Sequence, residues 1–446
     1  MNAIIIPCSR TANYEKGGGQ LKSSRDFRRC ISGCFLAAAI AAPALSQQVF
    51  EGNHAVPPTF AGQTRAPLAP KSASFVITDF VTGLNRPWAM VHMPNGKMLV
   101  TEVPGRLRII GPDGSVSSPV EGVPAVRAWG SRGLNDVILD PDFADNRKLY
   151  FTYLAAPAGV DSDNSDAAYD RFNAERQDWD KLSQEEKAAN PWGHWRVASA
   201  RLAEDEKSIS DLNVVIETVP SRMAFDKAGK LLITTQRKSP MGEPDLKSTL
   251  GMVLRLNTDG SVPDDNPFIG NDDVNDMAYV IGLRNSNSLE MNPITGDFWV
   301  ADQGGDAGDE VNVIVAGKDY GWPYVSYGRM GGTKPVGTGF TTKPGTEMPI
   351  YYWSPVSMAP SDMMFYTGDM FPQWKGNLFL TGLSSMHMSR LVLAGNHVVG
   401  EERLLDEPGH RLRHVSQGPD GAIYVLEDMP DPRILKLTAP LSSGQN

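Results

Sequence analysis

Cysteine is nearly absent from this sequence of 446 residues. The three that occur, Cys8, Cys30 and Cys34, all lie near the N-terminus, so the rest of the chain contains no thiol and no disulfide. This absence excludes cysteine nucleophiles and thiolate metal sites from the main body of the protein. A body without thiols must be stabilised by packing, and it is indifferent to an oxidising compartment.

Long apolar runs and common catalytic motifs are missing as well. After the N-terminal region no apolar run approaches the roughly 20 residues of a membrane-spanning helix, so we expect no membrane insertion. The sequence contains no H-E-x-x-H zinc motif, no G-x-S-x-G serine motif and no glycine-rich phosphate loop between a strand and a helix. The formal net charge of −10 argues against nucleic acid as a partner.

Residues 1–46 have the pattern of a signal peptide. Three arginines between positions 25 and 29 precede an apolar run over 31–42, and small residues then lead to a cleavage site after Ser46. The apolar run is too short to span a bilayer, and a buried N-terminal helix is the alternative interpretation. Removal of the segment changes the net charge to about −14 and implies a periplasmic or secreted protein.

The composition, with 43 Gly and 33 Pro, favours many short strands joined by turns. Residues 47–74 predict an extended lead-in, followed by the fold at 75–437 and a tail at 438–446. A Gly- or Asn-containing turn followed by a short β-rich run recurs six times, at 94–102, 144–154, 227–235, 294–302, 374–383 and 419–428. Six such units predict an all-β, six-bladed β-propeller, with a two-sheet sandwich as the alternative.

One charged, helix-favouring stretch, residues 169–195, interrupts this pattern. Ser183 and Glu186 have the spacing of a helix capping box, and Asn190-Pro191 is a stop signal. We interpret the stretch as an inserted loop with helical turns. It is either a solvent-exposed loop that extends from a blade or a lid over a substrate pocket.

The densest polar cluster is the Gly-rich segment 301–312. It contains Asp302, Asp306, Asp309 and Glu310. Calcium takes six to eight oxygen ligands, and flexible glycines let carboxylates and carbonyls converge on it. The spacing differs from that of an EF-hand loop, so an acidic surface turn is the alternative.

Arg411 and Arg413 stand two apart in a run that predicts a strand, so their guanidinium groups share one face. The neighbouring His410 and His414 would point the other way. Two guanidinium forks on one face suit a ligand with several carboxylates, although exposed arginine pairs are also common on strands.

Eight phrases occur in one collinear order from about Phe75 to Leu437. They are GLNRPWAM, LVTEVPGRLRII, GLNDVILDPDF, LRLNTDGSVPDDNPF, GLRN, GDEVNVIVAGKDYGWP, MMFYTGDMFPQWKGNLF and RLRHVSQGPDG. Together they resemble the soluble glucose/sorbosone dehydrogenase family, pyrroloquinoline quinone (PQQ) enzymes that oxidise aldoses. The resemblance covers nearly the whole chain after the predicted signal peptide, and it implies the same six-bladed propeller.

The resemblance also implies a set of site residues. The positions that match the quinone site are Arg284, Asn285, Arg411 and Arg413, and those that match a calcium site are Glu310, Tyr320 through its backbone, Gly304 and Gly305. The last two stand where the family has a carbonyl-donating Gly-Pro pair. In the family mechanism a histidine takes the proton of the anomeric hydroxyl while hydride moves to the quinone, whose carbonyl is polarised by calcium.

The sequence departs from the family at this base. The histidine normally stands shortly before an S-R-x-x-F phrase, but this chain reads VVIETVPSRMAFD there, with Thr218 as the nearest counterpart. A threonine hydroxyl cannot accept a proton near neutral pH as imidazole can. Other family residues are replaced at Ser131, Gln236-Arg237 and Ser384. The resemblance thus implies a remodelled site with weak or absent aldose oxidation, and His194 and His387 are the candidates for a substitute base.

Three functions are compatible with the sequence. The first is a PQQ- and calcium-dependent dehydrogenase of a sugar or another alcohol, with an exported electron acceptor as a further partner. The second is a non-quinone enzyme that uses a metal as Lewis acid in the same cavity. The third is a non-catalytic propeller that binds a glycan or another exported protein.

Overall fold

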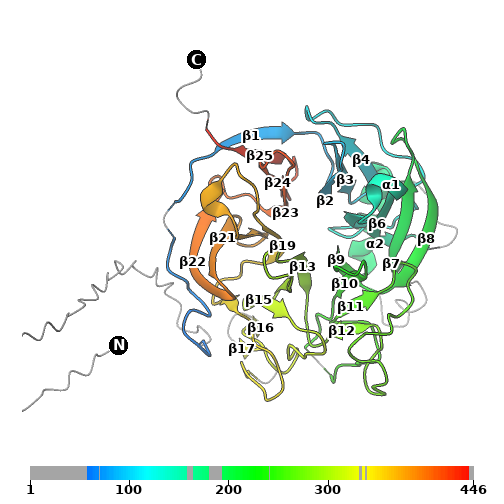
Figure 1. Cartoon of the computed structure of the whole chain (residues 1–446). Coiled ribbons are helices and arrows are strands. Elements are labelled where there is room, and N and C mark those ends of the chain that lie inside the picture. The colour runs from blue at the N-terminus through cyan, green and yellow to red at the C-terminus, as the bar shows by residue number, and fades with distance from the viewer. Residues whose placement is uncertain are drawn as a thin grey trace, which may run out of the picture. The chain divides into compact units, whose positions relative to one another are not determined.

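The computed structural model describes residues 58–69, 71–157, 164–179, 193–240, 242–330, 334–336 and 339–440. In this part of the chain six antiparallel sheets follow one another around a central axis, as Figure 1 shows. The predicted six-bladed β-propeller is confirmed. The predicted signal peptide at 1–46 lies outside the described residues.

The first three blades follow one another in the sequence. Blade 1 contains β2 (Pro87–His92), β3 (Met98–Glu102) and β4 (Arg106–Ile110). Blade 2 contains β5 (Leu134–Leu139), β6 (Lys148–Ala155), β7 (His194–Leu202) and β8 (Ile209–Glu217). Blade 3 contains β9 (Pro220–Phe225), β10 (Leu231–Thr235), β11 (Val253–Leu256) and β12 (Ala278–Val280).

The other three blades each have four strands. Blade 4 contains β13 (Ser286–Met291), β14 (Phe298–Asp302), β15 (Asp309–Ile314) and β18 (Tyr351–Trp353). Blade 5 contains β19 (Pro360–Phe365), β20 (Leu378–Gly382), β21 (Met388–Ala394) and β22 (His397–Leu404). Blade 6 contains β23 (Leu412–Gln417), β24 (Ile423–Glu427), β25 (Ile434–Thr438) and β1 (Val76–Val81).

The smaller elements lie in the connections. They are α1 (Phe143–Asn146), α2 (Asp166–Trp179), the 3-10 turn η1 (Pro372–Trp374) and a two-stranded ribbon of β16 (Arg329–Met330) and β17 (Lys334–Pro335). No helix of the described residues is long and apolar enough to cross a membrane.

Strand β1 closes the ring. It pairs antiparallel with β25, with Val76 opposite Thr438, so the first strand of the fold is the outer strand of the last blade (Figure 1). The pairing covers the outer edge of β25, which would otherwise offer its backbone groups to other chains.

The six repeated turn-and-strand segments of the sequence form the same part of each blade. Each is the turn between the first and second strands of a blade together with the second strand, which is β3, β6, β10, β14, β20 or β24. Their alternation predicts strands that are buried on one face, but all five residues of β3, β10, β14, β20 and β24 are buried. The reason is that each blade is covered by a neighbour on both faces.

The hydrophobic core is divided among the blade interfaces. Six clusters of buried side chains form in the described part of the chain, one between each pair of consecutive blades. Trp299 and Trp374 are the largest side chains that are fully buried. Burial of a large aromatic side chain contributes on the order of 2–3 kcal/mol, so packing alone can stabilise a body without disulfides.

The predicted insertion contains a helix that starts earlier than expected. Helix α2 begins at Asp166, and the Ser165 hydroxyl accepts a hydrogen bond from the Ala168 amide at 3.2 Å, as an N-cap residue does. Tyr169 of α2 donates its hydroxyl to the Gly130 carbonyl at 2.9 Å. The capping box predicted at Ser183 and the stop at 190–191 lie outside the described residues.

The parts of the lead-in that the structure describes, residues 58–69 and 71–74, are irregular, and the first of them packs on the blades. The Gln63 side chain is fully buried and donates to the Tyr327 hydroxyl at 3.1 Å and to the Pro349 carbonyl at 2.8 Å. Leu68 forms a parallel bridge with Glu401. The lead-in therefore belongs to the fold and holds blades 4 and 5 together.

One buried arginine occupies the polar centre of the ring. Arg222 lies on β9, and its guanidinium group contacts the inner strand of each of the other five blades. The partners are Asp136 on β5 (2.9 Å), the carbonyls of Asn287 on β13 (3.0 Å), Ser361 on β19 (2.8 Å) and Arg413 on β23 (3.4 Å), and the ring of Trp88 on β2 (4.2 Å to its centroid). These contacts tie the six blades to one another at the axis.

Replacement of Arg222 by Met should destabilise the protein strongly. Removal of one partner leaves the buried Asp136 carboxylate without its cation, which typically costs about 3–5 kcal/mol. The measurement is urea unfolding of purified protein. The control is Arg201→Met, because the pair of Arg201 with Asp211 is exposed and should be worth at most about 1 kcal/mol. Equal unfolding midpoints for the two variants would contradict a central role for Arg222.

Candidate functional site

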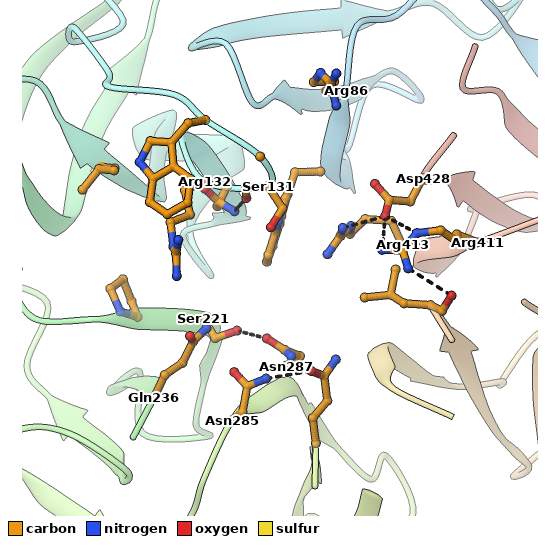
Figure 2. Close-up of a pocket in the computed structure, with 18 of the residues that line it drawn as sticks. Arg86, Ser131, Arg132, Ser221, Gln236, Asn285, Asn287, Arg411, Arg413 and Asp428 are labelled. Atoms are coloured by element: carbon orange, nitrogen blue, oxygen red, sulfur yellow. Dashed lines mark hydrogen bonds and ion pairs between the residues drawn. The ribbon is translucent and has the colours of Figure 1, made fainter. Parts of the chain in front are cut away.

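A cavity of about 890 Å³ opens at one end of the ring axis (Figure 2). The inner strands β2, β5, β9, β13 and β23 begin at this end, and the turns after β10, β14, β20 and β24 reach it. The lining therefore includes residues from all six blades. A cavity of this size, with polar groups converging from several elements, is the usual form of a small-molecule site.

Arg411 and Arg413 lie on one wall and meet a shared carboxylate, Asp428, as Figure 2 shows. Arg411 donates to Asp428 Oδ2 from Nη2 at 2.7 Å and from Nε at 3.0 Å, and Arg413 donates from Nη2 at 2.8 Å. The prediction that the two guanidinium groups share a face is confirmed. Burial alone would raise the pKa of Asp428, but Arg413 and Arg411 offset this effect and lower it.

The alternation predicted around these arginines fails at His414. A β-bulge between Leu412 and His414 breaks the pairing of β23 with β24. His414 consequently turns toward the axis, where its Nδ1 atom lies 2.8 Å from Asp362 and 3.2 Å from Arg222. An extra residue in a strand redirects the side chains after it, and the sequence pattern gave no signal of the bulge.

Asn285 lies on the wall that blades 3 and 4 form. Its side-chain amide donates to Gln303 Oε1 at 2.7 Å, and Gln303 donates in turn to the Pro360 carbonyl at 2.8 Å. Its Oδ1 atom is buried and has no hydrogen-bond partner among the described residues. Asn285 therefore carries an unused acceptor beside the cavity.

Arg284 is placed differently from its neighbour. It does not line the large cavity but a small one next to it, where Nη1 donates to the Gln303 carbonyl at 2.8 Å. Its guanidinium carbon lies 5.3 Å from the centroid of the Trp322 ring. Of the four residues that match quinone-binding positions, the structure thus brings three to the large cavity.

The acidic segment does not form one cluster of carboxylates. Asp302 accepts hydrogen bonds from the amides of residues 284 and 285, and Asp309 accepts from the amides of residues 304 and 359. Asp306 is exposed. Among the described residues no group of three or more His, Cys, Asp or Glu side chains is arranged to hold a metal ion. Two of the four carboxylates serve instead to fix the turns around the site.

Glu310 is the exception in this segment. It lines the small cavity together with Gly304, Tyr320 and Arg284, whereas Gly305 lies outside the lining. Burial and, to a smaller extent, the nearby Asp302 carboxylate raise the pKa of Glu310 to about 8. A buried carboxylate with a raised pKa favours a bound proton or a bound cation.

The wall opposite Asp428 contains residues that the sequence analysis did not select. Arg132 stacks on Trp129, with its guanidinium carbon 4.0 Å from the ring centroid, and Trp195 and Lys238 are further lining residues of the cavity. Figure 2 shows Arg132 on the far side of the cavity from Asp428. Tryptophans beside glycines in loops between strands are the signal that could have identified Trp129.

Neither the counterpart of the family base, Thr218, nor the two candidate substitutes, His194 and His387, line the large cavity. The Thr218 hydroxyl lies 2.8 Å from the Thr249 hydroxyl. His194 is exposed at the start of β7, where its neighbours Gly193 and Trp195 line the cavity and it does not. His387 lines a separate cavity of about 230 Å³ and contacts the Ser385 carbonyl at 2.9 Å. The structure therefore brings neither histidine to the proposed quinone residues.

The six blades and the polar cavity at their axis define the protein as a β-propeller with a central cavity. Residues 84–436 match the Glucose / Sorbosone dehydrogenase family. The chain is 32% identical to aldose sugar dehydrogenase YliI of Escherichia coli (strain K12) over 368 residues, which is 80% of this chain and 90% of that protein. It belongs to the glucose/sorbosone dehydrogenase family of PQQ-dependent sugar dehydrogenases.

Solved structures agree with this assignment. The apo form of the soluble aldose sugar dehydrogenase from Escherichia coli is 31% identical and superimposes with a TM-score of 0.70, covering 82% of this chain and 100% of that one. The PQQ-bound aldose sugar dehydrogenase from Streptomyces coelicolor shares the fold at 21% identity, with a TM-score of 0.61 over 83% of this chain and 99% of that one.

Replacement of Asp428 by Asn should lower stability in a pH-dependent way. Because the arginines lower the pKa of Asp428, its contribution is present above the unfolded value of about 3.9 and is lost as pH falls through the folded value. We expect a loss of about 1–3 kcal/mol at pH 7 that shrinks as the pH falls below about 4. Urea unfolding across this range measures it. A loss of the same size at every pH would show that the carboxylate charge is not responsible.

Proposed function

We propose that the protein is an exported PQQ-dependent dehydrogenase of aldoses, with the quinone bound between the Arg411–Arg413 wall and Asn285. The observation that carries this proposal is the convergence of two guanidinium groups on one wall of a large central cavity. Arginine forks bind carboxylates in bidentate pairs, and PQQ is a tricarboxylate. Family membership supports the same ligand class.

The residues present fit such a ligand. Arg413 is buried, its Nε atom has no partner among the described residues, and burial lowers its pKa although Asp428 opposes the effect. An anionic ligand would supply the second carboxylate that the two arginines lack. Asn285 Oδ1 would supply an acceptor on the other side of the ring system.

We place the sugar in the rest of the cavity. Trp129 and Trp195 line it, and tryptophan rings pack against the apolar side of sugar rings. When bound, the quinone supplies the redox chemistry, because it accepts the hydrogen at C1 of the sugar with its electron pair. The protein has to orient the sugar, exclude water and remove the hydroxyl proton.

The proposed calcium site uses Glu310 and the backbone of Tyr320 and Gly304, which line one small cavity. A calcium ion there would hold Glu310 in its charged form, which burial otherwise disfavours. Arg284 lines the same cavity and opposes a cation, whereas Gly305, the fourth residue implied by the family pattern, does not reach it.

Residues 25–46 support export, and an exported electron acceptor would then reoxidise the quinone. Thr218 at the position of the family base favours a second candidate, a non-catalytic propeller that binds a glycan. Quinone titration and turnover distinguish the two candidates.

The quinone should bind, and the arginines should carry much of its affinity. Arg411→Gln or Arg413→Gln removes charge-assisted hydrogen bonds worth about 1.5–3 kcal/mol, so each should weaken binding about ten- to a hundredfold. Absorbance titration of purified protein with PQQ and calcium measures affinity, and a dye-linked assay with aldoses measures turnover. Arg201→Gln, on β7 and away from the cavity, is the matched control. Wild-type protein that binds no PQQ would exclude the proposed function.

Calcium should stabilise the protein through Glu310. A ligand present at one hundred times its dissociation constant stabilises the folded state by about 2.7 kcal/mol, so a chelator should lower the melting temperature and calcium should restore it. Glu310→Gln should abolish the response, because it removes the only charged ligand proposed. Melting curves of wild type that do not change with chelator would count against this site.

A further inference from the structure

The cavity needs a proton acceptor, and its described lining offers few. The charged side chains there are four arginines, two carboxylates and one lysine. Guanidinium groups do not give up their proton in proteins and cannot act as bases. The choice therefore lies between Glu427, Asp428 and Lys238.

Both carboxylates are committed to other partners. Asp428 is held by Arg411 and Arg413, and Glu427 accepts from Arg433 at 2.8 Å and lies 2.7 Å from His410. Burial would raise the pKa of Glu427, but Arg433 and His410 offset this effect and lower it, as the arginines do for Asp428. A carboxylate with a lowered pKa is a poor proton acceptor.

Lys238 differs from both carboxylates. It follows β10 and lines the cavity, and it forms no hydrogen bond or ion pair with any described residue. The charged groups that face it are Arg132 from the loop before β5 and Arg284 from the connection before β13. Both are cations, so no described side chain stabilises a charged ammonium group there.

The backbone around Lys238 is fixed toward the proposed quinone residues. Gln236 forms a bridge with Asn285, and the Arg237 amide donates to the Arg284 carbonyl at 2.7 Å. The Arg237 carbonyl accepts from the Trp322 indole at 2.8 Å. Lys238 is thus held on the same wall as Asn285, while its own side chain keeps contact with solvent.

We propose that Lys238, in its uncharged form, is the catalytic base that takes the proton of the anomeric hydroxyl. The inference rests on the proposed function. As the O–H bond breaks, the proton moves to Nζ and a C=O bond forms at C1, so the aldose becomes a lactone. The C1 hydrogen leaves with its electron pair to the quinone, which is reduced by two electrons.

The electrostatics support this assignment. Partial desolvation of Lys238 in the cavity wall, together with the positive charges of Arg132 and Arg284, lowers its pKa to about 8. Roughly one tenth of the side chain is then uncharged at pH 7, against less than a thousandth for an unperturbed lysine with a pKa near 10.4. A base whose pKa lies close to the working pH is the most effective kind.

The kinetic test compares wild type, Lys238→Met and Lys238→Arg after reconstitution with PQQ and calcium. Both variants should lose about 10²- to 10⁴-fold in kcat/KM, because neither side chain can take a proton. In wild type kcat/KM should rise with pH to a plateau above about 8, and this limb should disappear in both variants. Lys207→Met, on the turn between β7 and β8, is the control. Wild-type rates in Lys238→Arg would show that only the charge matters and would overturn the proposal.

A second measurement does not depend on turnover. Protein free of quinone is treated with limiting acetic anhydride at a series of pH values, and acetylation of Lys238 is quantified by mass spectrometry. The midpoint should lie near pH 8, and a midpoint near 10.4 would overturn the proposal. Wild type that binds no quinone, or oxidises no aldose, refutes the proposed function and with it the role of Lys238. Turnover that survives both substitutions refutes the role of Lys238 alone.

Discussion

The guanidinium group of Arg222 is the point on which the geometry of the site depends. It contacts the inner strands of the other five blades, through Asp136, three backbone carbonyls and the ring of Trp88. One of these carbonyls belongs to Arg413, so the same contact that joins the blades also sets the position of a cavity arginine. A buried charge tolerates little displacement from its partners, which makes this centre rigid. The cavity above it is therefore built on a fixed floor.

The two halves of the cavity differ in how well their residues match the family pattern. The half with Arg411, Arg413 and Asn285 keeps the residues that the family pattern implies. In the other half, Thr218 at the position of the family histidine does not line the cavity, and tryptophans and cations do. Under the proposed function, a lysine with a lowered pKa would take the part of the imidazole, since both lose their charge near physiological pH.

The fold could be predicted because its signals are local. Each turn-and-strand phrase, such as 227–235, specifies one hairpin, and six hairpins of this kind close into a ring. The pair of Arg411 and Arg413 could be predicted for the same reason, since strand alternation is a local property. The turn of His414 toward the axis could not, because it depends on a bulge. Lys238 was missed because its lowered pKa arises from desolvation in the cavity wall and from Arg132 and Arg284, which are distant in the sequence and meet only in the folded ring.

The pairing of β1 with β25 has a consequence for how the ring is made. The two strands are almost the first and almost the last of the fold, so the sixth blade cannot be completed until the whole propeller segment is available. Contacts between such distant positions form late, because the entropy of closing the loop opposes them. A chain that emerges from its N-terminal end must therefore keep β1 without its partner while five blades assemble. Any process that delays the synthesis of β25 therefore leaves the sixth blade incomplete.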